Sequence, residues 1–267
     1  MDKENNEITL VSIITVSYNS SKTIEDTIKS ILNQTYTNIE YIIVDGNSTD
    51  NTIDILKSSA KLFEIRNIDY RWISEPDKGI YDAMNKGIFM AKGDIIGIIN
   101  SDDWYSDDAV IEAVKTLKNE TFAIVSGERR KVKFNKKPYG VYYNKKEIKS
   151  YIHKVMPINH AATFVHNTVY EKVGVFDTRY KLSADYDFIY RAFNASVNFM
   201  FIDKIIVNMR NSGATGQLKN LSVTAKEDLH IRKKNKVKFA QFYYIKRLGF
   251  NILIIIRDTL RNMINKD

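Results

Sequence analysis

Hydrophobic and polar positions in the first hundred residues follow a repeating pattern of short apolar runs and segments with helical spacing. The apolar runs, at residues 11–16, 41–44, 70–74 and 94–100, predict four strands. Between them, apolar residues recur every three or four positions, in the sets Ile24, Ile28, Ile31, Leu32; Ile53, Leu56, Ala60; and Ile80, Met84, Gly87, Ile88, Ala91. This alternation predicts a mainly parallel sheet with helices on both faces.

The second half of the chain loses this rhythm. Residues 121–127, 160–165 and 199–209 predict strands, residues 169–176 and 186–194 predict helices, and a basic segment at 129–143 resembles a hairpin. Residues 211–216 predict a flexible loop, and helix dominates from Lys219 onward. We therefore expect an α/β fold: a Rossmann-like half, a central mixed, mostly parallel sheet, and C-terminal helices. The expected domains are 1–215 and a helical extension at 216–267.

Composition limits the chemistry. With 267 residues, 44% hydrophobic content and three prolines, the chain is long enough for a sizeable core. It has no cysteine and four scattered histidines, which argues against a zinc enzyme and leaves open a hard metal held by oxygen ligands. The polar, partly acidic start is unlike a secretory signal, so a cytoplasmic location is expected.

The net charge of +8 is concentrated in two basic clusters, at residues 129–137 and 232–238. Such clusters predict an anionic neighbour. The second cluster leads into the apolar residues 252–256, a run far shorter than the roughly 20 residues that span a bilayer. Two alternatives stay open: this tail lies on an anionic membrane surface, or it packs on the protein's own core with a solvated basic face. Nucleic acid is not the expected partner, because carboxylates follow the predicted strands.

Polar residues follow each of the four predicted strands. They are Ser17-Tyr18-Asn19, Asp45-Gly46-Asn47-Ser48, Glu75-Pro76-Asp77 and Asn100-Ser101-Asp102-Asp103. Ligands of open α/β sheets bind beyond the carboxyl ends of the strands, so one crevice should collect all four segments. The adjacent carboxylates of Asp102 and Asp103 suit a divalent cation. Their alternative is a loop and helix cap, the interpretation that we prefer for Ser106, Asp107 and Asp108.

Four segments, taken together, resemble the family 2 glycosyltransferases, which have the A-type nucleotide-sugar fold. They are residues 11–19, 44–50, 77–87 and 100–103, and the resemblance in order and spacing extends over about residues 10–210. It implies inverting transfer of a sugar from a nucleotide-diphosphate donor to an acceptor hydroxyl, with Mn²⁺ or Mg²⁺ on the diphosphate. It also implies a nucleotide-sugar-binding half at 8–105 and an acceptor half at 106–215.

The resemblance assigns roles to individual residues. Those expected to bind the donor are Ser17, Tyr18, Asn19, Asp45, Asp77, Asp82 and Asp102, and those expected to hold the metal are Asp103 and Asp102. Residues 182–188 resemble the family's acidic base segment, with Ala184 in place of the usual glutamate, so Asp185 is the expected general base. Asp187 is expected to cap or solvate the following helix.

Two further residues have open interpretations. His160 matches a family position near the acceptor and is expected either to contact the acceptor or diphosphate or to be structural. Trp104 is expected either to stack on a sugar or to lie in the core.

The sequence departs from the family pattern at two motifs. Many family members carry Asp-Asp-Gly-Ser where this chain has residues 45–48, so a second base-contacting carboxylate is missing here. The glutamine-arginine-tryptophan motif of processive relatives is also absent, which favours addition of a single sugar.

The expected function is therefore transfer from a UDP-sugar to a saccharide or a lipid-linked oligosaccharide in bacterial surface polysaccharide synthesis. A sugar-phosphate nucleotidyltransferase is one alternative, although such enzymes typically carry a glycine-rich loop after the first strand and residues 18–23 contain no glycine. A non-enzymatic protein that binds membrane or nucleic acid through its basic clusters is the other.

Overall fold

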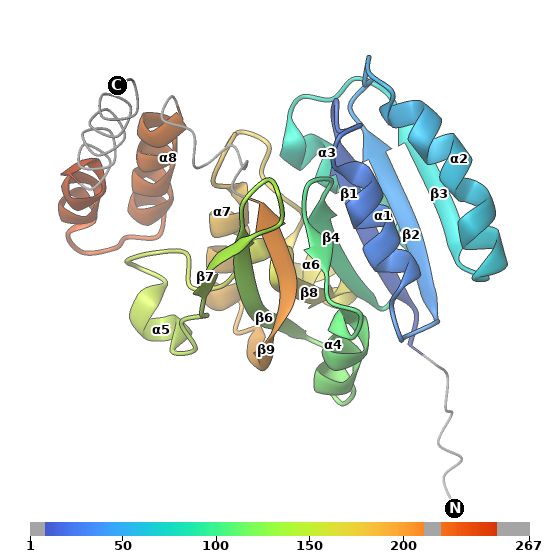
Figure 1. The fold of residues 1–267 in the computed structure, drawn as a ribbon. Helices are drawn as coiled ribbons and strands as arrows, with labels where there is room; N and C mark the ends of the chain where they lie inside the picture. The colour runs from blue at the N-terminus through green and yellow to red at the C-terminus, as the bar shows by residue number, and fades with distance from the viewer. Residues whose placement is uncertain (1–8, 211–219, 250–267) are drawn as a thin grey trace, which may run out of the picture.

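The fold is built on one mixed sheet. A computed structural model describes residues 9–210 and 220–249, and the expected loop at 211–216 and apolar run at 252–256 lie outside the described residues. The strand order is β3-β2-β1-β4-β8-β6-β9-β5, with β7 paired to β6 (Figure 1). The strands are β1 (Val11–Ser17), β2 (Ile39–Asp45), β3 (Asp69–Ser74), β4 (Ile95–Asn100), β5 (Trp104–Tyr105), β6 (Ala123–Val132), β7 (Pro138–Tyr142), β8 (Thr163–His166) and β9 (Asn198–Arg210).

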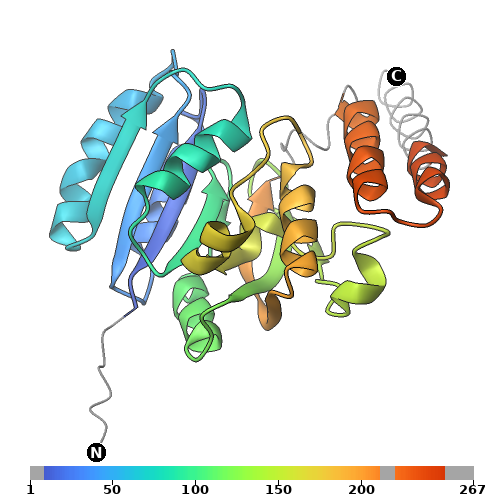
Figure 2. The same cartoon turned by 180° about the vertical axis from the view of Figure 1, so that it is seen from behind.

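Helices cover both faces of this sheet (Figures 1 and 2). They are α1 (Ile24–Leu32), α2 (Thr52–Ile65), α3 (Ile80–Met90), α4 (Ala109–Leu117), α5 (Ile148–Tyr151), α6 (Asn167–Val173), α7 (Ala184–Asn194) and α8 (Leu221–Lys234). Successive residues of β1 point to opposite faces, so Ile13 packs in the core with α1, α2 and α4, whereas Ile14 packs with α3, α6 and α7. This arrangement explains why β1 is buried along its whole length.

The first four strands confirm the prediction of a parallel half. β1 pairs with β2 and β4, and β2 pairs with β3, all in parallel. Their register places Asp45 opposite both Ser17 and Ser74, and Val16 opposite Asn100. The polar ends of all four strands therefore meet at one edge of the sheet.

The second half is mixed, as expected. β8 joins β4 and β6 in antiparallel pairs, β6 pairs in parallel with β9, and β6 and β7 form the predicted basic hairpin. Two predicted boundaries are wrong. Residues His160–Ala162 form a 3-10 turn rather than the start of a strand, and the helix expected at 169–176 is Asn167–Val173. That helix ends earlier because Gly174 adopts φ 85, which interrupts helical geometry.

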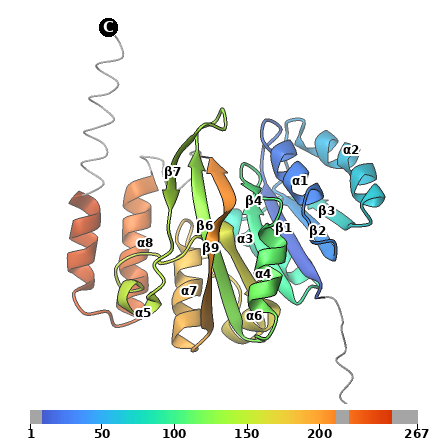
Figure 3. The same ribbon diagram turned by 60° about the horizontal axis from the view of Figure 1, so that its bottom comes forward.

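Between residues 221 and 249 the chain is mainly helical, with α8 followed by a helix at 240–249 beside it (Figure 3). α8 packs on the second half of the sheet domain: Ile231 is fully buried, and the Arg232 guanidinium donates to the carbonyls of His153 and Lys154. Among the described residues, no helix combines the length and the apolar content needed to cross a bilayer.

Candidate active site

Hydrogen bonds between side chains fasten together the carboxyl ends of three parallel strands. The Asp45 carboxylate accepts from the Ser17 hydroxyl at 2.8 Å and from the Ser74 hydroxyl at 2.8 Å. It also accepts from the backbone N–H and the hydroxyl of Ser48, at 2.8 and 2.6 Å. Asp45 thus accepts four hydrogen bonds and is fully buried, so it holds the carboxyl ends of the strands together. Its expected contact with the donor stays a prediction.

The loop after β2 approaches the loop after β3 closely. A Cβ atom at Gly46 would lie 2.5 Å from an Asp77 carboxylate oxygen and 3.5 Å from the Tyr18 ring, so a larger residue there would force the Asp77 side chain to move. Asn47 takes φ 65, a left-handed conformation that asparagine tolerates better than most residues. The Asp-Gly-Asn-Ser sequence thus provides both a close contact and the turn that follows it.

Further side chains join the loops after β1, β2 and β4. The Asn19 backbone donates to the Ser48 hydroxyl at 2.8 Å, and the Asn19 side chain accepts from the Thr49 backbone at 2.9 Å. Ser20 and Ser101 share a hydroxyl hydrogen bond of 2.7 Å. These contacts hold three loops around one hollow.

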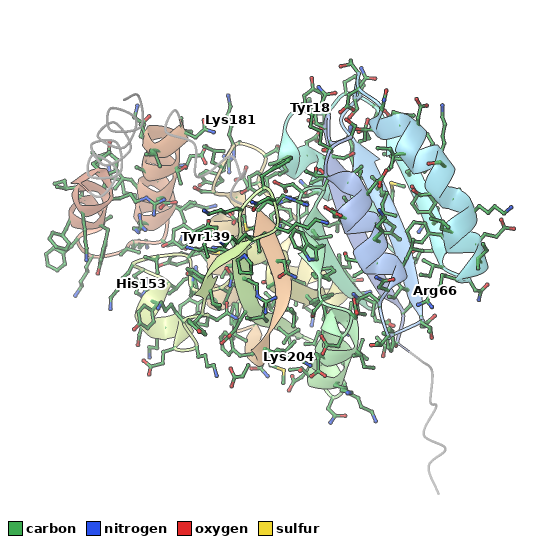
Figure 4. All side chains as sticks on the ribbon, in the orientation of Figure 1. Tyr18, Arg66, Tyr139, His153, Lys181 and Lys204 are labelled. Atoms are coloured by element: carbon green, nitrogen blue, oxygen red, sulfur yellow. The ribbon has the colours of Figure 1, made fainter. Side chains whose placement is uncertain are left out.

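That hollow is a cavity of about 620 Å³, which we call the donor cavity. Its walls include Val16, Ser17, Tyr18, Asn19, Ser20, Lys22, Thr23, Asp77, Gly79, Ile80, Ala83, Asn100, Ser101, Asp102 and Phe134. Tyr18 and Phe134 are both exposed, at 63% and 65%. Figure 4 shows Tyr18 at the edge where the parallel strands end, and Lys204 at the opposite edge.

Five of the seven residues expected to bind the donor are therefore in the cavity wall, while two are not. Ser17, Tyr18, Asn19, Asp77 and Asp102 line the donor cavity. Asp45 and Asp82 are not among the lining residues. The Asp82 carboxylate accepts a hydrogen bond from the Lys78 backbone at 3.0 Å and lies 3.8 Å from the Lys86 ammonium. Asp82 thus stabilises the start of α3, and its contact with the donor stays a prediction.

Asp102 and Asp103 have different surroundings. Asp102 lines the donor cavity, whereas Asp103 is fully buried. One Asp103 oxygen accepts from the Arg210 backbone at 3.0 Å, and the other has no hydrogen-bond partner among the described residues. Burial, and then the charge of Asp102, raise the pKa of the Asp103 carboxyl well above its usual range.

Arg210, at the end of β9, holds the loop that carries these aspartates. Its buried guanidinium donates to the Asp102 carbonyl and pairs with the Asp26 carboxylate. It also lies 4.7 Å from the centre of the Trp104 ring. Trp104 is not among the residues that line the donor cavity, so its ring stabilises Arg210, and stacking on a sugar stays a prediction.

The residues present fit a cation carried by a nucleotide. No group of three or more His, Cys, Asp or Glu side chains that could hold a metal occurs in the described part of the chain. Mg²⁺ is commonly held by only one or two carboxylates together with substrate phosphates. Asp102 in the wall supplies one such carboxylate, and the unpartnered Asp103 oxygen lies on the next residue.

A second cavity, of about 360 Å³, adjoins the first, and we call it the middle cavity. Ile80 and Asn100 line both, so the two meet there. Asp185, at the start of α7, and His160 line the middle cavity. The Asn100 side-chain oxygen is buried without a hydrogen-bond partner among the described residues. Buried polar atoms are normally paired, so an unpaired one at this junction suggests a bound ligand or water.

The two candidate acids of α7 differ sharply. The Asp185 carboxylate accepts from the Tyr81 hydroxyl at 3.0 Å and from the Tyr186 backbone at 2.9 Å, and it lines the middle cavity. Asp187 is fully buried and pairs with Arg191 at 2.8 Å and with Lys234 at 2.9 Å. Asp187 is therefore a buried, ion-paired acid within α7, and the expectation that it caps or solvates the helix is wrong.

Tyr81 and His160 keep defined protonation states beside Asp185. Burial, and then the charge of Asp185, raise the pKa of Tyr81 well above its usual range, so its phenol stays protonated and donates. Burial lowers the pKa of His160, which favours the neutral ring. The His160 ring packs edge-on against Phe176 at 5.7 Å, and its Nε2 atom has no partner in the described structure.

Helix α8 holds the loop that precedes Asp185 in place. The Glu227 carboxylate, on α8, accepts from the backbone N–H groups of Lys181, Leu182 and Ser183 at 2.8 to 2.9 Å. The neighbouring Asp228 accepts from the Ser183 hydroxyl at 3.0 Å. α8 is therefore part of the framework that positions Asp185.

Comparison with known proteins identifies the class. The model of glycosyl transferase family 2 matches residues 12–197, so the chain belongs to this family. It is a glycosyltransferase, as its relatives also indicate. An uncharacterised glycosyltransferase of Mycobacterium tuberculosis is 32% identical over 189 residues, 68% of each chain. The hyaluronan synthase of Pasteurella multocida is 30% identical over 227 residues, 84% of this chain and 23% of the synthase.

Solved structures confirm the A-type fold. TarS 1–349 of S. aureus in complex with UDP-GlcNAc superposes with a TM-score of 0.65 at 17% identity, covering 91% of this chain and 80% of that one. The mannosyltransferase PcManGT of Pyrobaculum calidifontis, in complex with GDP-Man and Mn²⁺, gives 0.64 at 16% identity, covering 96% and 81%. A match to a longer TarS chain covers 39% of that chain. At these identities the likeness shows the fold alone.

Sequence reasoning missed several residues that build the site. Arg210 directly follows the strand predicted at 199–209, so the rule on strand ends could have found it. Tyr81 lies inside one of the four matching segments but on a helix, so that rule gives no signal for it. Phe134 and Glu227 gave no such signal, because they reach the site only through the β6–β7 hairpin and the packing of α8.

Proposed function

We propose that this glycosyltransferase moves a sugar from a nucleotide-diphosphate donor to an acceptor hydroxyl with inversion at the anomeric carbon. The single observation that carries the proposal is the continuous pair of cavities. The donor cavity contains Asp102, the middle cavity contains Asp185, and Ile80 and Asn100 line both. A donor-side carboxylate in one cavity and a candidate base in the adjoining one suit an attack from the side opposite the leaving group.

The donor is proposed to be a UDP-sugar. Tyr18 offers an exposed ring, and Ser17, Asn19 and Asp77 offer hydrogen-bonding groups for a base and ribose in the donor cavity. Asp102, with Asp103 behind it, would hold Mn²⁺ or Mg²⁺ on the diphosphate. Such a cation neutralises the charge that develops on the departing diphosphate.

The residues of the middle cavity would perform the transfer itself. Asp185 would accept the proton of the acceptor hydroxyl while that oxygen bonds to the anomeric carbon. The bond from this carbon to the diphosphate oxygen breaks, and its electron pair leaves with the diphosphate. The Tyr81 hydroxyl would orient the Asp185 carboxylate, and the Glu227 contacts would hold its loop.

The proposed acceptor is a saccharide, free or lipid-linked, in the synthesis of a surface polysaccharide by cytoplasmic enzymes. Relatives named for polysaccharide synthesis support this class, among them the Pasteurella hyaluronan synthase and a putative teichuronic acid biosynthesis glycosyltransferase of Bacillus subtilis, 37% identical over 114 residues. Phe239, Phe242 and Ile245 are exposed beside basic residues of the last described helix. This combination supports peripheral contact with an anionic membrane.

Thermal stabilisation by UDP, GDP and CDP, each with and without Mn²⁺, tests the donor site. Wild type should be stabilised by UDP in a Mn²⁺-dependent way, and Asp102→Asn should lose this response. Asp107→Asn is the matched control, because it removes an exposed carboxylate of the same region. Stabilisation by no nucleotide, or an unchanged response in Asp102→Asn, would contradict the proposal.

A further inference from the structure

A third cavity, of about 460 Å³, shares Asp185 with the middle cavity and, among the described residues, shares no lining residue with the donor cavity. Its walls come from α8, the helix at 240–249, the segment before β8, and residues 182–186 at the start of α7. Met156, Leu182, Asp185 and Arg247 line both this cavity and the middle one. An acceptor that places a hydroxyl at Asp185 can therefore extend its remainder into this space.

The charge of this third cavity is predominantly positive. Four cationic side chains line it, Lys154, Arg232, Lys246 and Arg247, against the carboxylates of Asp185 and Asp228. Burial is the main reason that the pKa of Asp228 is raised, and Arg232 and Arg247 partly oppose this shift. The wall therefore has two more cations than carboxylates when all six groups are charged.

Two guanidinium groups in this wall have unused donors. Arg232 is 3% exposed and donates to the His153 and Lys154 carbonyls, yet its Nη1 atom has no hydrogen-bond partner among the described residues. The Nε atom of Arg247 is likewise buried and unpartnered there. A buried donor without an acceptor destabilises the protein, and more so when it is charged. An acceptor group supplied by a ligand would remove this cost.

Packing holds the Arg232 guanidinium in place. It lies 5.4 Å from the Tyr186 ring centre and 5.8 Å from that of Tyr243. The ring of Tyr186 is in turn fixed, since its hydroxyl donates to the Ile152 carbonyl at 2.5 Å. A preorganised arginine of this kind is suited to phosphate, whose oxygens accept two parallel N–H donors.

We propose that the third cavity binds a phosphate group of the acceptor, through Arg232 and Arg247, while the acceptor hydroxyl lies at Asp185. The proposal rests on the proposed function for the role of Asp185. The phosphate belongs either to a lipid carrier or to a soluble sugar phosphate, and the chemistry of recognition is the same for both.

Binding of N-acetylglucosamine 1-phosphate, measured by calorimetry against the neutral methyl glycoside, tests the proposal. The phosphate should bind the wild type, and Arg247→Gln should weaken it about tenfold, since a hydrogen bond to a charged group is lost. Lys233→Gln is the matched control, because it removes an exposed cation next to Arg232. Arg232→Lys, which retains the charge but not the paired donors, should also weaken binding, and the melting temperature of each variant reports folding.

Asp102→Asn separates this site from the donor cavity. It should bind the sugar phosphate as the wild type does. Loss of binding in Asp102→Asn with retention in Arg247→Gln would overturn the proposal, as would equal affinity for the neutral glycoside or no binding to wild type. If the wild type binds the sugar phosphate through Arg247 but no nucleotide, the phosphate site stands and the proposed transferase function fails.

The dodecyl phosphodiester of the same sugar, in micelles, identifies the source of the phosphate. Affinity equal to that of the soluble phosphate supports recognition of the anion alone. Tighter binding that Arg247→Gln still weakens supports a lipid-linked acceptor. An affinity for the diester that Arg247→Gln leaves unchanged would overturn the proposal.

Discussion

The donor side and the acceptor side of this site are held together by different kinds of contact. On the donor side, Asp45 accepts from Ser17, Ser48 and Ser74, so the strand ends are held by the chain itself. On the acceptor side, His160 Nε2, Arg232 Nη1 and Arg247 Nε have no hydrogen-bond partner in the part of the chain that the structure describes. The donor side also has atoms without a partner among the described residues, Asn100 Oδ1 and Asp103 Oδ2, so both sides leave polar atoms for a ligand. The two sides differ in that side-chain hydrogen bonds between neighbouring strands build the donor side, whereas contacts between distant segments build the acceptor side.

Arg210 is the residue whose loss should damage the donor side most. Arg210→Met removes a buried guanidinium from Asp26 and from the Asp102 loop, and should lower the free energy of unfolding by about 3 kcal/mol, as measured by urea denaturation. Lys136→Met is the matched control, because Lys136 pairs with the same Asp26 from an exposed position and should cost less than about 1 kcal/mol. Equal losses of unfolding free energy in the two variants would contradict the expected difference between a buried and an exposed partner of Asp26.

The pH dependence of the stability of Arg210→Met tests the same ion pair between Arg210 and Asp26. Burial raises the pKa of Asp26, but hydrogen bonds from Lys136 and Arg210 outweigh it and hold the pKa below its ordinary value of 3.8. A lowered pKa stabilises the fold above that value, and the contribution is lost as the pH falls through the pKa of the folded state. The stability gap between wild type and Arg210→Met should therefore narrow in acid.

Among the residues that position Asp185, the largest effect is expected at Glu227. Glu227→Ala frees the backbone of residues 181–183 and should lower kcat by up to about 10²-fold through misplacement of Asp185, with nucleotide affinity unchanged. Glu227→Gln retains one acceptor oxygen and should recover part of the rate. A parallel loss of nucleotide affinity would show that α8 supports the donor side as well.

A smaller loss is expected at Tyr81. Tyr81→Phe removes one hydrogen bond to the Asp185 carboxylate and should lower kcat about tenfold. Because the pKa of Tyr81 is raised well above its usual range, the phenol donates at both pH 7 and pH 9, and the loss should appear at both. A loss confined to one of the two would argue against this role.

The smallest effect is expected at Phe134, an exposed ring of the β6–β7 hairpin in the wall of the donor cavity. Phe134→Ala should weaken nucleotide binding about threefold in calorimetry, the size of a single aromatic contact. Tyr139→Ala, in the same hairpin but outside the cavity wall, should leave the affinity unchanged. An equal effect of the two changes would remove Phe134 from the site.

The same contrast explains what the sequence could predict. The donor side is formed by consecutive strands and helices, so local periodicity and the rule on strand ends predicted β1 to β4 and placed Ser17 and Asp102 correctly at the cavity. The rule does not say which way a side chain points. Asp45, for example, does not line the donor cavity, because its carboxylate accepts hydrogen bonds from serines on both neighbouring strands.

The acceptor side depends on contacts between segments far apart in the chain, for which periodicity gives no signal. The pairing of Tyr81 with Asp185, and of Glu227 with residues 181–183, follows only from the packing of α3, α7 and α8. The burial of Asp187 has the same cause in part: Arg191 pairs with it from the next turn of α7, but Lys234 reaches it from α8.

The account depends most on the separation of donor binding, at Asp102, from catalysis, at Asp185. The most direct test measures kcat and nucleotide affinity together on Asp185→Asn. The account predicts a fall in kcat of about 10²–10⁴-fold, the usual contribution of a general base, with unchanged nucleotide affinity. A kcat close to that of the wild type, or a loss of nucleotide binding in step with the rate, would contradict it.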